Sequence, residues 1–224
     1  MNALRHFTTH FYQTKDGRAV SDIRDSLITS YIEKLKHPSG TMREGFSLAF
    51  GALPKFMLDG YLSKVIESLL RVAEVPEKDA GKFASSRADA LDSLANIAET
   101  VGIQREGDCN CVINESTLTQ LYQSCFKAMN DYTIDSRGDV GSWSRKAAMT
   151  CMHKLSLIVT ETDAELLSKH MCSEMMCCLL KQCSEKIDHT RAHAGEIMLK
   201  LIHKQNPAIP NIPEHEKLCD IFPR

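Results

Sequence analysis

The stretch DSRGDVGSWSRKAAMTCM (residues 135–152) joins a turn to the start of a helix. Its two glycines suit the turn, because glycine adopts backbone angles that other residues avoid. From Trp143 onward, apolar side chains return every three or four positions, at Ala147, Cys151 and Leu155. This spacing places them on one face of an α-helix. The stretch therefore predicts a turn followed by a helix, with Trp143 as the first core residue of that helix and an exposed binding anchor as the alternative for Trp143.

An arginine near a helix start, followed by small residues, occurs four times in the chain. The four are Arg43, Arg87, Arg145 and Arg191, at intervals of 44, 58 and 46 residues. One further helical pattern lies between each pair. A two-helix unit that recurs about every 40 to 47 residues is typical of HEAT and armadillo repeats. The sequence therefore predicts an all-α fold, a HEAT/armadillo-like α-solenoid of antiparallel helix pairs, with about four repeats in a single segment over 1–224.

The four arginines are predicted to be structural. An arginine early in a helix can pair with an acidic residue in the preceding turn, and Asp139 precedes Arg145 just as Asp188 precedes Arg191. The small residues that follow the arginines allow neighbouring helices to approach closely. Both features serve the packing of one helix pair against the next, which is what a solenoid requires.

Polar segments with glycine or proline separate the helical patterns. They lie at 37–40, 75–82, 133–141 and 206–213. The longest connection, 102–116, is polar and is predicted to be a flexible inter-helix loop. No segment between turns shows the alternation of a β-strand. Both ends of the sequence resemble parts of further helix pairs, so the chain is expected to be a piece of a longer solenoid.

Composition and charge exclude several classes of protein. With 27 basic and 29 acidic residues, the net charge of -2 gives no electrostatic basis for binding nucleic acid. No apolar run approaches the roughly 18 to 20 residues of a membrane-spanning helix, and the first residues lack the apolar centre of a signal peptide. The nine cysteines cannot all pair with one another, and the chain shows no secretory signal, so they are expected to be reduced thiols. A cytosolic protein is predicted.

The triplet Arg137-Gly138-Asp139 has the sequence of a cell-adhesion motif, which acts only on an exposed loop of a secreted protein. The surrounding stretch lacks the alternating acidic residues of a calcium loop and the Gly-Lys-Ser/Thr ending of a phosphate loop. We interpret it as a turn on the ridge of the solenoid. Asp135, Arg137 and Asp139 are predicted as partner-binding residues.

Metal binding and catalysis are weaker alternatives. Cys109 and Cys111 are too closely spaced for a usual zinc site, and a zinc site shared by the sequences Cys151-Met-His153 and His170-Met-Cys172 requires two neighbouring antiparallel helices. Cys151 and Cys172 lie on apolar stripes, which favours packing. No pattern joins a nucleophile to a base. The sequence predicts no metal, no cofactor and no enzymatic activity, with a zinc protein kept as a minor alternative.

Four stretches carry a resemblance to a known family. They are REGFSLAFGALPKFML (43–58), DYTIDSRGDVGSWSRKAAM (131–149), SEKIDHTRAHAGEIMLKLIH (184–203) and the closing IFPR (221–224). From about residue 20 to the end, the chain resembles the later part of the tubulin-folding cofactor D family. The segment 102–116 carries no part of this resemblance.

The resemblance implies a segment of a HEAT-like chaperone that is cytoplasmic and associated with the cytoskeleton. It implies β-tubulin as the client and cofactors C and E as partners in assembling the α/β-tubulin heterodimer. Stimulation of GTP hydrolysis by tubulin and association with a small Arf-like GTPase are also implied. The resemblance further implies that cofactor C supplies the arginine for GTP hydrolysis, so Arg137, Arg145 and Arg191 are given no catalytic role. A generic HEAT-repeat adaptor with another client is the alternative.

Overall fold

The structure, a computed structural model, describes residues 2–78 and 80–224. Within these residues helices dominate, and the strands are confined to one short hairpin. The elements in chain order are α1 (Asn2–Tyr12), α2 (Ser21–Lys34), α3 (Gly40–Ala52), α4 (Lys55–Leu58), α5 (Leu62–Ala73), the 3-10 helix η1 (Ala80–Phe83), α6 (Ala84–Val101), α7 (Glu115–Ala128), β1 (Ile134–Asp135), β2 (Gly138–Asp139), α8 (Gly141–Thr162), the 3-10 helix η2 (Ala164–Leu166), α9 (Lys169–Cys183), α10 (Asp188–Ile202) and α11 (His215–Ile221).

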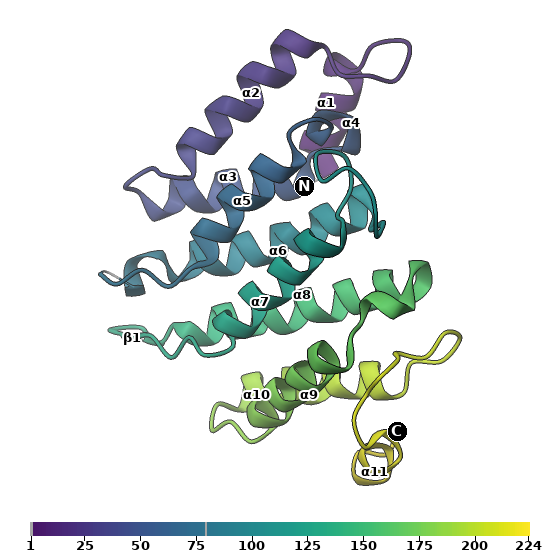
Figure 1. The fold of residues 1–224 in the computed structure, drawn as a ribbon. Coiled ribbons are helices and arrows are strands. Elements are labelled where there is room, and N and C mark those ends of the chain that lie inside the picture. The colour runs from purple at the N-terminus through teal and green to yellow at the C-terminus, as the bar shows by residue number, and fades with distance from the viewer. Residues whose placement is uncertain (1, 79) are drawn as a thin grey trace.

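The long helices form two layers (Figure 1). One layer holds α3, α6, α8 and α10 side by side, and the other holds α2, α5, α7 and α9. Each helix of the second layer leads through a turn into its antiparallel partner in the first, and successive pairs stack from α1 at one end to α11 at the other. The predicted all-α solenoid of antiparallel helix pairs is therefore confirmed.

The helices that carry the repeated arginine pack closely because small residues line their contacts. Gly51 on α3 faces Ser93 on α6, and a Cβ atom at Gly51 would lie 2.9 Å from the Cα atom of Ser93. Ala90 on α6 and Ala148 on α8 are completely buried. A larger side chain at these contacts would push the helices apart.

The core lies between the two layers. Its members are branched and unbranched apolar side chains that recur at helical spacing: Leu62, Val65, Leu69, Leu91, Leu94, Leu121, Leu155, Met175, Leu179, Ile197 and Leu201. Cys125, Cys151 and Cys172 belong to the same core, and every cysteine is a free thiol. These cysteines therefore pack as small apolar side chains, as the sequence indicates.

The connection 102–116 is held by several contacts. Ile103 and Ile113 form an isolated parallel β-bridge, and both side chains are buried. Arg105 donates to both carboxylate oxygens of Asp163, at 2.7 and 2.8 Å. The carbonyl of Asn110 accepts from the amide of Gly60 at 2.9 Å. These contacts tie the segment to other parts of the chain and oppose the flexibility that the sequence predicts for it.

Two negative findings apply to residues 2–78 and 80–224. No helix in them combines the length and the apolar character needed to cross a membrane. No group of three or more His, Cys, Asp or Glu side chains in them is arranged to hold a metal ion.

Candidate partner-binding site at the turn between α7 and α8

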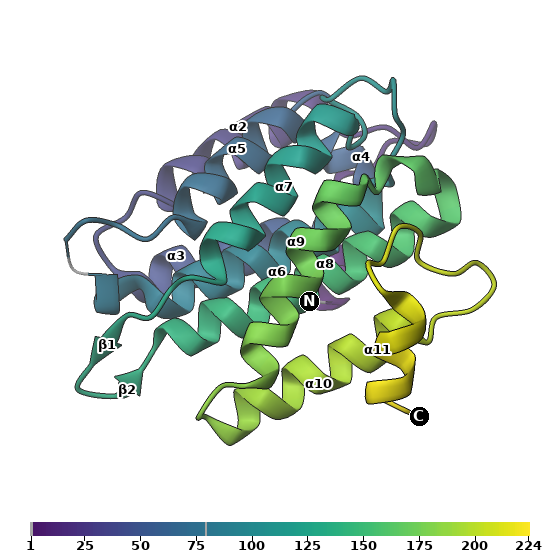
Figure 2. The same ribbon diagram turned by 60° about the horizontal axis from the view of Figure 1, so that its bottom comes forward.

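The Arg-Gly-Asp triplet lies in a β-hairpin, with Arg137 in the two-residue tip and Gly138 and Asp139 forming strand β2. Strands β1 and β2 pair antiparallel, with Ile134 opposite Asp139 and Asp135 opposite Gly138. Gly138 has a φ angle of 101°, which residues with a Cβ atom rarely adopt. In Figure 2 the hairpin projects toward the same edge of the molecule as the turn between α9 and α10. The sequence predicts the turn but not the strands, because two-residue strands are too short to show alternation.

A buried ion pair anchors the start of the hairpin. Asp131 and Arg87 have no exposed side-chain surface, and their atoms Oδ2 and Nη2 lie 2.8 Å apart. The Thr133 hydroxyl and amide donate to the other Asp131 oxygen at 2.6 and 3.1 Å. Burial alone would raise the pKa of Asp131, but the bonds from Thr133 and the charge of Arg87 lower it below its usual value. Asp131 is therefore ionised at neutral pH.

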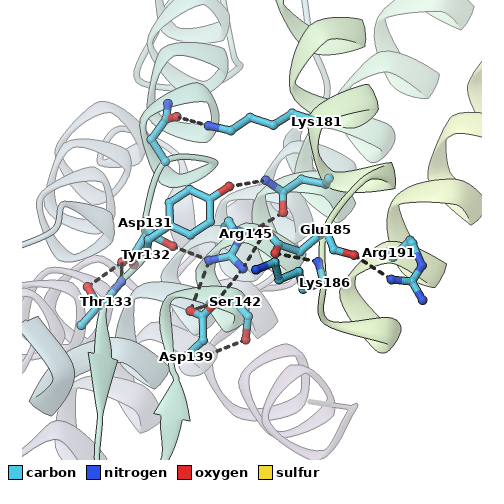
Figure 3. Close-up of polar contacts among 12 residues, drawn as sticks. Asp131, Tyr132, Thr133, Asp139, Ser142, Arg145, Lys181, Glu185, Lys186 and Arg191 are labelled. Carbon is cyan, nitrogen blue, oxygen red and sulfur yellow. Dashed lines mark hydrogen bonds and ion pairs between the residues drawn. The ribbon is translucent and has the colours of Figure 1, made fainter.

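Arg145 lies at the centre of the turn, with no exposed side-chain surface (Figure 3). It donates to the Asp131 carbonyl at 2.7 Å, to Asp139 Oδ2 at 2.9 Å and to Gln182 Oε1 at 3.0 Å. Its guanidinium carbon lies 4.2 Å from the centre of the Tyr132 ring. The predicted contact of Arg145 with Asp139 is present. Arg145 thereby joins the hairpin to α9 of the following helix pair.

Three of the four repeated arginines make the same backbone contact, and the fourth makes a side-chain contact in its place. Arg43, Arg87 and Arg191 each donate to a backbone carbonyl six or seven residues earlier, at 2.6, 2.6 and 2.7 Å. Arg145 reaches Asp139, also six residues earlier, through the side chain. Arg191 also forms the predicted ion pair with Asp188. The arginine of each unit therefore closes the turn that precedes its helix, which is the structural role that we propose for all four.

Asp135 and Arg137 bond to each other, and Arg137 also bonds to the preceding repeat. Arg137 donates to Asp135 Oδ2 and to the carbonyl of Gly81, both at 2.6 Å. Its hydrogen bonds lower the pKa of Asp135, and the bond with Asp135 raises the pKa of Arg137. At Gly81 an added Cβ atom would lie 2.7 Å from Asp135 Oδ2. These two predicted partner-binding residues therefore brace the hairpin against η1, as Asp139 braces it against Arg145.

Trp143 is not a core residue, contrary to the sequence prediction. Its side chain is 36% exposed, and its ring lies 5.1 Å from the guanidinium carbon of Arg137. Helix α8 instead buries the stripe that contains Ser142, Ser144 and Arg145. Arg145 can be buried because the turn supplies its hydrogen-bond acceptors, and this orientation of the helix leaves Trp143 beside the hairpin. Apolar spacing alone did not reveal this, since one of these partners, Gln182, comes from the next helix pair.

Two apolar side chains of the turn face solvent, beside the exposed Ser136 and Arg137. Ile134 is 76% exposed and Tyr132 is 42% exposed. Sequence reasoning missed both residues, and it also missed the buried partner Asp131. The available signal was weak: Tyr132 and Ile134 are two positions apart between polar residues, which is the spacing of side chains on one face of an extended segment.

The alternatives of metal binding and catalysis gain no support from the described residues. Cys172 is buried and donates to the carbonyl of Pro210, whereas the side chain of His170 is 86% exposed. Cys219 lies 3.6 Å from Nε2 of His215, but that nitrogen is also 2.6 Å from the carbonyl of Ile202. Nε2 must therefore carry a hydrogen, so it cannot act as a base toward Cys219. The arrangement at the turn can bind and position, and it contains no reacting pair.

Comparisons with known proteins agree with the resemblance seen in the sequence. A family model described as "Tubulin folding cofactor D C terminal" matches residues 173–224. The chain is 27% identical over 227 residues to the tubulin-specific chaperone D of Dictyostelium discoideum, an alignment that covers 88% of this chain. The resemblance to tubulin-folding cofactor D is confirmed. The tubulin-folding cofactor D of Schizosaccharomyces pombe is 36% identical over 87 residues, or 38% of this chain. No solved structure matches the chain significantly.

The chain spans only part of these relatives. The alignments cover 15% of the Dictyostelium protein and 7% of the Schizosaccharomyces protein. The match to the C-terminal model of tubulin-folding cofactor D includes most of α9 and all of α10 and α11, but it begins after the hairpin. The residues of that match that reach the turn are Lys181, Gln182 and Glu185.

Proposed function

We propose that this chain is a scaffold segment of a tubulin-folding cofactor D and that it binds β-tubulin. With the other tubulin-folding cofactors, C and E, it would contribute to assembly of the α/β-tubulin heterodimer and to stimulation of GTP hydrolysis by tubulin. A small Arf-like GTPase is the further proposed partner, and the proposed location is the cytoplasm, in association with the cytoskeleton. The observation that carries the proposal is the similarity to the Dictyostelium chaperone, which extends over 88% of the chain.

The architecture supports a function by binding instead of catalysis. A stable complex between two proteins buries about 1,600 Å² or more, and stacked helix pairs offer long continuous surfaces of that size. Each pair contacts mainly its neighbours, so the stack can bend along its axis while it holds or releases a client. We accordingly propose that the chain is not an enzyme.

A direct binding measurement tests this function. The chain is immobilised and incubated with purified α/β-tubulin, and retained β-tubulin is measured by immunoblot. An unrelated α-solenoid of similar length, immobilised at the same density, is the control. Retention of β-tubulin above the control is expected. Retention equal to the control would contradict the proposal. In a parallel incubation with cytosol, capture of a different client without β-tubulin or an Arf-like GTPase would favour the generic adaptor.

A further inference from the structure

Tyr132 and Ile134 form an apolar surface on the ridge of the solenoid. Successive side chains of an extended segment point to opposite sides. Asp131, Thr133 and Asp135 point into the turn, where their carboxylates and hydroxyl are bonded. Tyr132 and Ile134 therefore share the other side, and Ile134 is the most exposed large apolar side chain of the described residues.

Two hydrogen bonds hold this surface in place, one to its backbone and one to a side chain. The amide of Gly141 donates to the carbonyl of Thr133 at 3.0 Å, and Gln182 Nε2 donates to the Tyr132 hydroxyl at 3.2 Å. A Cβ atom at Gly141 would lie 2.3 Å from the Asp131 carbonyl oxygen, so the two chain segments are in direct contact. A surface that is already ordered loses little conformational freedom on binding, which favours its use as a contact.

The acidic side chains at this turn are paired with arginines, whereas one exposed basic side chain is not paired with a carboxylate. The carboxylates of Asp131, Asp135, Asp139 and Glu185 each lie within ion-pair distance of an arginine. The ammonium of Lys181 lies 5.2 Å from the centre of the Tyr132 ring and donates to the amide oxygen of Asn130. Among the described residues it has no carboxylate partner. The exposed chemistry beside Ile134 is therefore apolar and cationic.

We propose that Tyr132, Ile134 and Lys181 form a docking surface for an extended acidic segment of a protein partner. The segment places an apolar side chain against Ile134 and the Tyr132 ring, and a carboxylate against the Lys181 ammonium. The inference rests on the proposed function only in that the chain binds a protein client. A second copy of this chain is a poorer occupant, because a two-fold contact would bring the two Lys181 side chains together.

Two substitutions with matched controls test the surface. Ile134→Asp removes the apolar contact and adds a repelling charge, and Ile221→Asp makes the same change at another exposed isoleucine, which is 67% exposed on α11. Lys181→Glu reverses the cation, and Lys64→Glu makes the same change at an exposed lysine on α5. Circular dichroism and thermal melting are used to check that all four variants fold like the parent chain.

The probe is a short fluorescein-labelled peptide in which glutamates flank a central pair of leucines, read by fluorescence anisotropy. A second peptide carries glutamine in place of each glutamate. We expect the glutamate peptide to bind more tightly, with an affinity that falls as salt rises. Ile134→Asp and Lys181→Glu are each expected to weaken its binding about tenfold, which is the typical loss when a central interface residue is removed, and the two controls are expected to leave it unchanged.

Equal binding of the two peptides, no binding of either, or equal losses in Ile134→Asp and Ile221→Asp would overturn the proposal. The tubulin measurement separates this result from the proposed function. If β-tubulin is retained equally by the parent chain and both ridge variants, the surface is refuted while the function stands. If β-tubulin is not retained but the glutamate peptide discriminates between the variants and their controls, the function fails while the surface stands.

Discussion

Removing the charge of Asp131 is the sharpest test of how the turn between α7 and α8 is held. Asp131→Asn preserves the shape of the side chain and leaves the Arg87 guanidinium without a counter-charge at a position with no exposed surface. Breaking a buried pair by removing one partner costs about 3 to 5 kcal/mol, because the remaining charge stays out of water. Arg87 keeps its 2.6 Å bond to the carbonyl of Ala80, so we expect a loss at the lower end, about 3 kcal/mol.

The measurement is the free energy of unfolding from urea titrations followed by circular dichroism, for the parent, Asp131→Asn and Asp188→Asn. Asp188 also pairs with an arginine, but its side chain is 90% exposed, so its loss should change stability little. The double variant Arg87→Met/Asp131→Asn should recover part of the loss, because the stranded charge is removed. A loss for Asp131→Asn no larger than that for Asp188→Asn would refute the reasoning.

The same pair predicts a pH dependence. The folded pKa of Asp131 lies below its usual value, so its contribution to stability is present above the pKa of the unfolded chain. That contribution is lost as the pH falls through the lower pKa of the folded state. The difference in stability between the parent and Asp131→Asn should therefore be constant near neutral pH and should shrink in acid. A difference that is unchanged in acid would contradict the ionised state of Asp131.

Three further outcomes are expected. Gly141→Ala should lower the melting temperature, because its Cβ atom would lie 2.3 Å from the Asp131 carbonyl oxygen; Gly45→Ala, where nothing lies within 4 Å, is the control and should not. Trp143→Ala should lower the free energy of unfolding by well under the roughly 3 to 5 kcal/mol expected for a core tryptophan. A decrease of that full size in urea titrations would support a core position for Trp143. Arg105→Ala should speed amide hydrogen exchange across 102–116, because its bonds to Asp163 hold that segment; unchanged exchange would show that the other contacts suffice.

The helix pairs could be predicted because their signals are local. Apolar residues that recur every three or four positions indicate which segments are helices, and the interval between Arg43, Arg87, Arg145 and Arg191 indicates that the units repeat. The contact of Arg145 with Asp139 was also predictable, since the two residues are six positions apart in a turn and a helix start. Local spacing also indicated the burial of Cys151 and Cys172, because both lie on apolar helix faces.

Features that depend on distant partners could not be predicted in this way. Trp143 begins the apolar pattern of its stretch, yet α8 turns to bury Arg145, whose acceptors include Gln182 on another helix pair. Asp135, Arg137 and Asp139 were predicted as partner-binding residues; each is bonded within the chain, and Tyr132 and Ile134, which the sequence did not single out, are exposed beside Arg137. Hydrogen-bond partners far away in the chain decided which of these side chains face solvent.

The amino-acid sequence by itself determined the helices, the arginine-marked repeat and the resemblance to tubulin-folding cofactor D, because each depends on residues close together in the chain or on their order. Only the tertiary structure decided how those helices are oriented and which chemistry their ridge presents. The buried pair of Arg87 and Asp131 shows the reason: its members are 44 residues apart. A buried charge is stable only beside its partner, and stacking the repeats is what brings the two together.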